Sequence, residues 1–190
     1  MRTVSYLLGQ KVSLEDILAL HREAPELIIE RDAEGCLVMQ EPTGFYSGSQ
    51  NSELNYQVKH WNRKYLRDVV SDSSTGFLLP NQALRSPDVA WVSHERLAAL
   101  SPEQLEGFPP LVPDFLIELR SRSDQLPALL AKMEEYRSCG VRLGWLIDPL
   151  DKCVHIYRED GSTELLEGFD RDLSGESVLE DFLLDLRRLM

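Results

Sequence analysis

Cysteine is scarce in this chain of 190 residues. The three cysteines, Cys36, Cys139 and Cys153, are far apart, and none belongs to a Cys-x-x-Cys pair. Three scattered cysteines are too few for a disulfide framework, and without a Cys-x-x-Cys pair they do not form a structural metal site of that kind. We therefore expect a protein of the reducing cytoplasm.

Long hydrophobic runs are also missing. Residues 1–18 contain one short apolar run, which is interrupted at residues 9–11 (GQK) and followed by Glu15 and Asp16. This segment lacks the apolar core of a signal peptide. No later stretch approaches the ~20 apolar residues that a membrane-spanning helix needs. We expect no membrane partner.

Positive charge is in deficit. The chain has 20 Lys and Arg residues against 32 Asp and Glu residues, for a formal net charge of -12. Such a balance argues against tight non-specific binding to nucleic acid, because that affinity comes mainly from basic side chains on phosphates. A local basic surface stays compatible with these numbers.

The chain contains enough apolar residues for one hydrophobic core, since 43% of its residues are hydrophobic. We expect a single domain over residues 1–190, with an N-terminal helix and hairpin (1–50), a core (51–160) and a C-terminal extension (161–190). Apolar spacing predicts amphipathic helices and apolar strands in alternation, hence an α/β fold with a mixed central sheet flanked by helices. The predicted helices are residues 14–21, 51–69, 94–100 and 124–139, and the predicted strands are residues 27–29, 36–39, 76–79, 88–92, 114–120, 143–147 and 153–157. Residues 179–190 fit a helix and a strand equally.

Two of the predicted strands carry acidic residues inside apolar sequence. Residues 86–92 (SPDVAWV) contain Asp88, and residues 113–120 (PDFLIELR) contain Asp114 and Glu118. Burial of an unpaired carboxylate is costly, so these acids need partners. A divalent metal ion is one good candidate.

Strand geometry favours one pair of acids over the other. Asp114 and Glu118 lie on one face of their strand but roughly 13 Å apart at about 3.3 Å per residue, which is too far to share a metal. If the strands of Asp88 and Glu118 pair, the two side chains converge within ~5 Å. Two carboxylates with water suit Mg²⁺ or Mn²⁺. Arg120 and Lys132 are the candidate cations to stabilise charge on a phosphate.

The order of these motifs resembles the PD-(D/E)xK restriction-endonuclease-like superfamily, and more closely a bacterial family of uncharacterised restriction endonucleases. The resemblance runs over most of the chain, through residues 73–77 (SSTGF), 86–88 (SPD), 113–121 (PDFLIELRS), 132–136 (KMEEY) and 144–149 (GWLIDP). It implies a restriction-endonuclease-like fold with an N-terminal hairpin extension and metal-dependent hydrolysis of DNA phosphodiester bonds.

The resemblance also implies roles for individual residues. Asp88 and Glu118 would bind Mg²⁺, with the backbone carbonyl of Leu119 as a further ligand, and Glu53 on the helix over residues 51–69 could add a carboxylate. Lys132 would position or deprotonate water, or stabilise the pentacovalent phosphate. Arg120 occupies the superfamily's lysine position, where it would supply positive charge or orient Glu118, because arginine stays protonated and cannot act as a base.

Plainer alternatives exist for each residue and for the whole. Asp88 also fits a turn that follows proline. Glu118 could form a structural ion pair with Arg120 or Lys132. The aliphatic part of Lys132 could pack on apolar surface while its ammonium group reaches solvent. The domain could be a catalytically silent binding module on a nuclease fold. It could also be a structural homo-oligomer, most simply a dimer, joined at a strand edge.

Overall fold

A mixed sheet of six strands forms the centre of the molecule, with the strand order β10-β9-β8-β7-β6-β3. The computed structural model describes residues 10–24, 27–39, 42–64 and 68–190. The strands of this sheet are β3 (Val69–Asp72), β6 (Val89–Val92), β7 (Phe115–Leu119), β8 (Leu143–Asp148), β9 (Cys153–Arg158) and β10 (Thr163–Glu167). The predicted α/β architecture is confirmed.

The middle of the sheet is its only parallel pair among the described strands, β7 beside β8. Every residue of these two strands is buried, as expected for a parallel pair covered on both faces. Parallel neighbours need a crossover, which α6 (Leu126–Ser138) provides. The loop between β7 and α6 therefore opens at the carboxyl end of β7.

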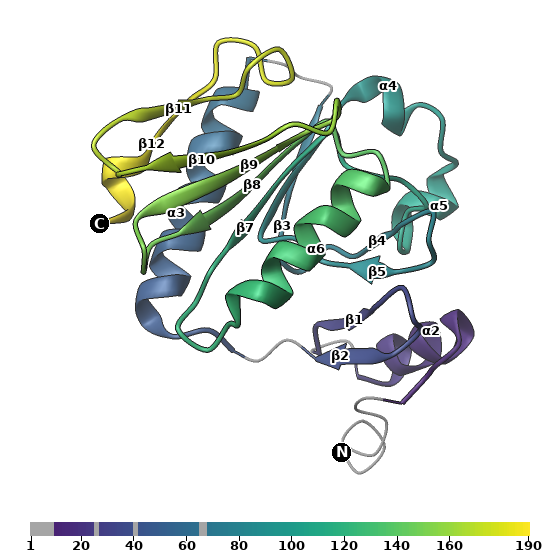
Figure 1. Cartoon of the computed structure of the whole chain (residues 1–190). Helices are drawn as coiled ribbons and strands as arrows, with labels where there is room; N and C mark the ends of the chain where they lie inside the picture. The colour runs from purple at the N-terminus through teal and green to yellow at the C-terminus, as the bar shows by residue number, and fades with distance from the viewer. Residues whose placement is uncertain (1–9, 25–26, 40–41, 65–67) are drawn as a thin grey trace.

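Each face of the sheet packs against a different layer, as Figure 1 shows. Ile117 and Trp145 belong to a core that includes the apolar face of α3 (Phe45–Asn62) and the C-terminal segment. Leu116, one residue away along β7, belongs instead to a core with Met133 and Tyr136 of α6. This alternation follows from the pleat of a strand, and it directs Glu118 to the α6 face.

Helix α3 differs from its prediction at both ends. The expected helix covered residues 51–69, whereas α3 begins at Phe45 and ends at Asn62, and Val69 opens β3. Buried Asn62 stabilises this end, because its Nδ2 donates to the Asp68 carbonyl and its Oδ1 accepts from the Trp91 indole. Val69 and Val70 then pair with Val92 and Trp91 across the sheet edge. Residues 65–67 lie outside the described residues.

The N-terminal hairpin is confirmed and joins a second sheet, in the order β2-β1-β5-β4. Its turn ends on Gly35, whose φ of +90° lies in the region that favours glycine. Helix α2, capped by Ser13, packs on this sheet. The strands are β1 (Ile29–Arg31), β2 (Leu37–Met39), β4 (Phe77–Leu78) and β5 (Leu84–Arg85), and α2 is Leu14–Glu23. Since β5 leads directly into Asp88 and β6, the hairpin lies next to the predicted site.

The C-terminal segment resolves the ambiguity of residues 179–190, which contain a strand and then a helical turn. Strand β12 (Leu183–Asp185) pairs with β11 (Asp172–Ser174), and η1 (Leu186–Leu189) follows as a 3-10 helix. Two short helices, α4 (His94–Leu97) and α5 (Pro102–Glu106), connect β6 to β7. Among the described helices, none is both long and apolar enough to cross a membrane.

Candidate active site

Asp88 and Glu118 lie side by side where β6 begins and β7 ends. The two strands are antiparallel, and Val89 pairs with Ile117, so Asp88 and Glu118 are the next residues outward on each strand. Glu118 is buried, and Asp88 is partly buried. The backbone amide of Leu119 donates to Asp88 Oδ2 at 2.8 Å, which ties the two strand ends together. The predicted pairing of the two strands is confirmed, and it places the two acids at neighbouring positions.

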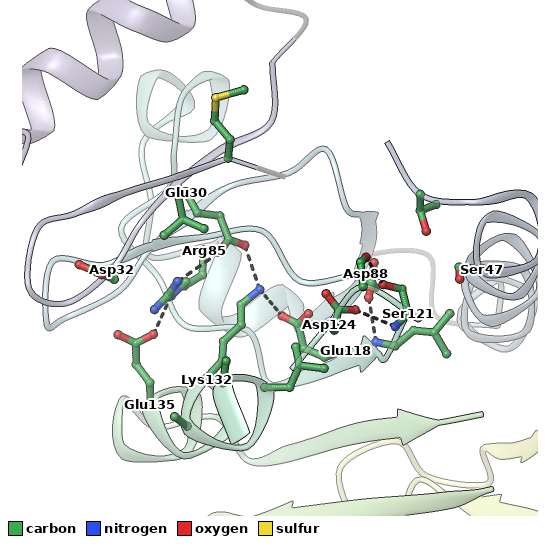
Figure 2. A pocket seen from close by; sticks show the side chains of 18 of the residues that line it. Glu30, Asp32, Ser47, Arg85, Asp88, Glu118, Ser121, Asp124, Lys132 and Glu135 are labelled. Carbon is green, nitrogen blue, oxygen red and sulfur yellow. Dashed lines mark hydrogen bonds and ion pairs between the residues drawn. The ribbon is translucent and has the colours of Figure 1, made fainter. Parts of the chain in front are cut away.

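Both acids line a cleft with a volume of about 1240 Å³ between the sheet end, the N-terminal hairpin and the start of α3. Figure 2 shows its labelled side chains approaching from these separate elements. Phe45 and Tyr46, at the start of α3, also line the cleft and are 86% and 81% exposed. Arg122, from the loop after β7, contributes a positive charge to the lining. The cleft is therefore open to solvent and large enough for part of a polymer.

Lys132 lies between two buried carboxylates. Its Nζ is 2.8 Å from Glu118 Oε1 and 2.9 Å from Glu30 Oε1. The hydroxyl of Tyr136, one helical turn further along α6, donates to the same Glu118 oxygen at 2.9 Å. The ammonium group of Lys132 thus points into the cleft (Figure 2) rather than to solvent over an apolar stem.

Glu30 belongs to β1 of the hairpin and extends this cluster away from Asp88. Its Oε2 is 3.2 Å from Nη1 of Arg85, and its Oε1 accepts from the Ser86 amide at 2.9 Å. Nε of Arg85 in turn lies 2.6 Å from Oε2 of Glu135 on α6. The chain of alternating charges joins the hairpin, β5 and α6, and so holds Lys132 from the side opposite Glu118.

The environment perturbs the ionisation of each buried group. Burial raises the pKa of Asp88, and it raises the pKa of Glu118 to about 7 against the opposing effect of Lys132. Burial would lower the pKa of Lys132, but Glu118 and Glu30 outweigh it and raise that pKa above its ordinary value. At neutral pH the site therefore contains a firmly protonated lysine beside two acids that ionise reluctantly.

Other predicted residues lie elsewhere. Arg120 does not contact Glu118 in the described structure, since its Nη1 lies 2.5 Å from Asp148 Oδ2 and 2.9 Å from Asp151 Oδ2. Glu53 accepts from Gln57 one turn along α3. Asp114 pairs with Arg96 at 2.9 Å near the other end of β7. Strand β7 ends at Leu119, so side-chain alternation no longer governs the direction of Arg120.

Sequence reasoning missed three residues that complete the cluster, Glu30, Arg85 and Asn51. Glu30 follows Leu27-Ile28-Ile29 in an apolar strand, so the cost of burying a carboxylate, the argument that found Glu118, also applies to it. Arg85 and Asn51 carry no such signal. Their positions depend on how the hairpin sheet and α3 meet the end of β7.

A family model and a solved structure are similar to this chain. The model of the Uma2 family, described as "Putative restriction endonuclease", matches residues 14–187. The chain belongs to the Uma2 family. Among curated proteins, no match was found.

A solved structure shares the fold of this Uma2 chain. It is described as the crystal structure of a "putative nuclease belonging to DUF820" from Anabaena variabilis ATCC 29413. The two chains are 19% identical, the likeness covers 85% of this chain and 88% of that chain, and the TM-score is 0.72. The resemblance to restriction endonucleases is thus confirmed for family and fold, and the description of the family supports a nuclease function.

Proposed function

We propose that this Uma2 protein is a metal-dependent endonuclease that hydrolyses DNA phosphodiester bonds. One observation carries the proposal: Asp88 and Glu118 lie together at a strand end, both with raised pKa values, and a protonated Lys132 lies 2.8 Å from Glu118. Adjacent buried acids are unfavourable alone, and a divalent cation between them offsets both their desolvation and their mutual repulsion.

The donor set fits Mg²⁺ or Mn²⁺. Asp88 and Glu118 offer carboxylate oxygens, which hard cations prefer. No group of three or more His, Cys, Asp or Glu side chains in the described residues is arranged to hold a metal, so other oxygens must complete the set. The Leu119 carbonyl and water are candidates. Such an ion would polarise a phosphate and would lower the pKa of water, so that hydroxide is available to attack the phosphorus.

Lys132 acts in this proposal as a fixed positive charge. Its raised pKa makes it a poor general base at neutral pH, because it seldom gives up its proton. A cation held in place stabilises the negative charge that develops on phosphate during hydrolysis. Glu30 and Tyr136 are positioning residues, since they restrain Lys132 and Glu118 from outside the pair.

Nucleic acid suits the mouth of the cleft as a substrate. The exposed rings of Phe45 and Tyr46 offer surfaces for base stacking, and Arg122 offers a charge for a phosphate. The cleft lining as a whole stays acidic, so base stacking has to supply much of the affinity for the substrate. Single-stranded DNA should therefore be tested beside supercoiled plasmid.

The test of this function is cleavage of both DNA forms with Mg²⁺, Mn²⁺ or EDTA. We expect cleavage only with metal. Asp88→Asn should lower the cleavage rate by more than about 100-fold, because even the loss of a residue that only orients a metal ligand typically lowers activity about 10- to 100-fold. Glu134→Gln is the matched control, since it removes another negative charge from the cleft lining, where Glu134 pairs with Arg137. A wild type that binds DNA without cutting it would support the silent binding module.

Metal affinity is expected to rise with pH between about pH 6 and 8. Glu118 must lose its proton before it can bind a cation, and its pKa is about 7. The dissociation constant for Mn²⁺, measured by calorimetry across this range, should fall as pH increases, and each binding event should release protons to the buffer. An affinity that is constant from pH 6 to 8 would remove Glu118 from the ligand set.

A further inference from the structure

Asn51 places a buried oxygen without a hydrogen-bond partner beside Asp88. The residue lies on α3, and its Nδ2 donates to Asp88 Oδ1 at 2.8 Å. Its Oδ1 is buried and accepts no hydrogen bond from any residue in the described part of the chain. A buried amide oxygen left in this way costs about 1–3 kcal/mol, so its retention calls for an explanation.

The location of this oxygen indicates a ligand rather than a packing defect. Four buried side-chain atoms of the described residues lack a partner, in Asn51, Ser71, Arg120 and Trp145. Only Asn51 among these four lines the cleft that contains Asp88 and Glu118. Its unpaired atom is also an acceptor, the type of atom that coordinates a hard cation.

We propose that Asn51 supplies a third side-chain oxygen to a divalent cation held by Asp88 and Glu118. The inference rests on the proposed function and adds a ligand to its metal site. Without a cation, the amide nitrogen of Asn51 donates to Asp88 Oδ1. With a cation bound, a half-turn of the amide about its Cβ–Cγ bond exchanges nitrogen for oxygen on the side facing Asp88.

The chemistry of an amide explains why this position carries asparagine rather than aspartate. An amide has a donor and an acceptor on the same carbon, so one side chain serves both states of the site. A third carboxylate next to Asp88 and Glu118 would add repulsion to two acids whose pKa values are already raised. The neutral oxygen of Asn51 therefore adds a ligand without the repulsion that a third carboxylate would bring to the metal-free protein.

Calorimetric titration of the full chain with Mn²⁺ at pH 8, without DNA, tests the proposal separately from catalysis. Asn51→Leu keeps the approximate size and removes both polar atoms, and we expect its dissociation constant to rise about 10- to 100-fold. Asn51→Asp keeps an oxygen and removes the donor, and we expect it to bind Mn²⁺ at least as tightly as the wild type. Asn55→Leu is the matched control, because Asn55 lies one turn along α3 and donates to Ser71 instead.

The outcomes separate this inference from the proposed function. Wild-type affinity in Asn51→Leu would overturn the ligand role alone, and equal weakening in Asn51→Leu and Asn51→Asp would reduce Asn51 to a donor for Asp88. Absence of Mn²⁺ binding by the wild type would overturn both proposals. Circular dichroism in EDTA checks that each variant folds, and Asn51→Ala replaces Asn51→Leu if the latter does not.

Discussion

Glu118→Gln is expected to abolish DNA cleavage and at the same time to increase the free energy of unfolding at pH 8 in EDTA. Folding raises the pKa of Glu118 from an ordinary 4.5 to about 7, so the folded state favours the neutral form. The stability that protonated Glu118 contributes is fully present below about pH 4.5 and is lost as pH rises through 7. Gln mimics the neutral form at every pH, and it should stabilise the protein by about 1–3 kcal/mol at pH 8.

Chemical denaturation at pH 5 and pH 8 measures this effect, beside cleavage assays on the same preparations. The gain should be largest at pH 8 and small at pH 5, where wild-type Glu118 is already largely protonated. A variant that is less stable than the wild type at pH 8 would contradict the prediction. It would mean that ionised Glu118 exists to pair with Lys132, which is the structural ion pair that the sequence also allows.

Lys132→Met is expected to have the opposite effect on stability and the same effect on activity. Met keeps most of the apolar stem but leaves Glu30 and Glu118 buried without the ammonium that both contact. Removal of one partner from a buried ionic cluster typically costs about 3–5 kcal/mol. The loss of the positive charge should also lower the cleavage rate by about 100- to 1000-fold.

Denaturation at two pH values again provides the readout, with Lys59→Met as control because Lys59 is exposed on α3. The destabilisation of Lys132→Met should be smaller at pH 5 than at pH 8, since protonation of Glu118 at the lower pH relieves the charge that Lys132 no longer balances. The control should stay within about 0.5 kcal/mol of the wild type. Full cleavage activity in a folded Lys132→Met protein would exclude the role proposed for this lysine.

Much of the fold was predictable because its signals are local. Every residue of β7 and β8 is buried, and the continuous apolar runs in the sequence reflect that burial directly. Helix α6 follows from its apolar spacing, and the hairpin follows from a glycine-containing turn. The C-terminal end of α3 was predicted wrongly, because it depends on contacts from Asn62 to Asp68 and Trp91, which apolar periodicity cannot report.

The site divides in the same way. Asp88, Glu118 and Lys132 were found from sequence, because buried acids need partners and because their order resembles a known family. Arg120 turns toward Asp148 and Asp151, since the strand has already ended. The predicted roles of Asp88, Glu118 and Lys132, the metal, DNA as substrate and a homodimer remain predictions that the experiments above and light scattering can test.

The sequence by itself determined which segments are buried, which acids lie inside them, and therefore that charge must be compensated near the end of β7. Only the tertiary structure decided how it is compensated. Glu30 and Arg85 arrive from the N-terminal sheet and Asn51 from α3, and each lies more than 30 residues along the chain from the group it contacts in the cluster, Lys132, Glu135 or Asp88. Packing of separate elements sets these contacts, and no pattern within a single segment encodes them.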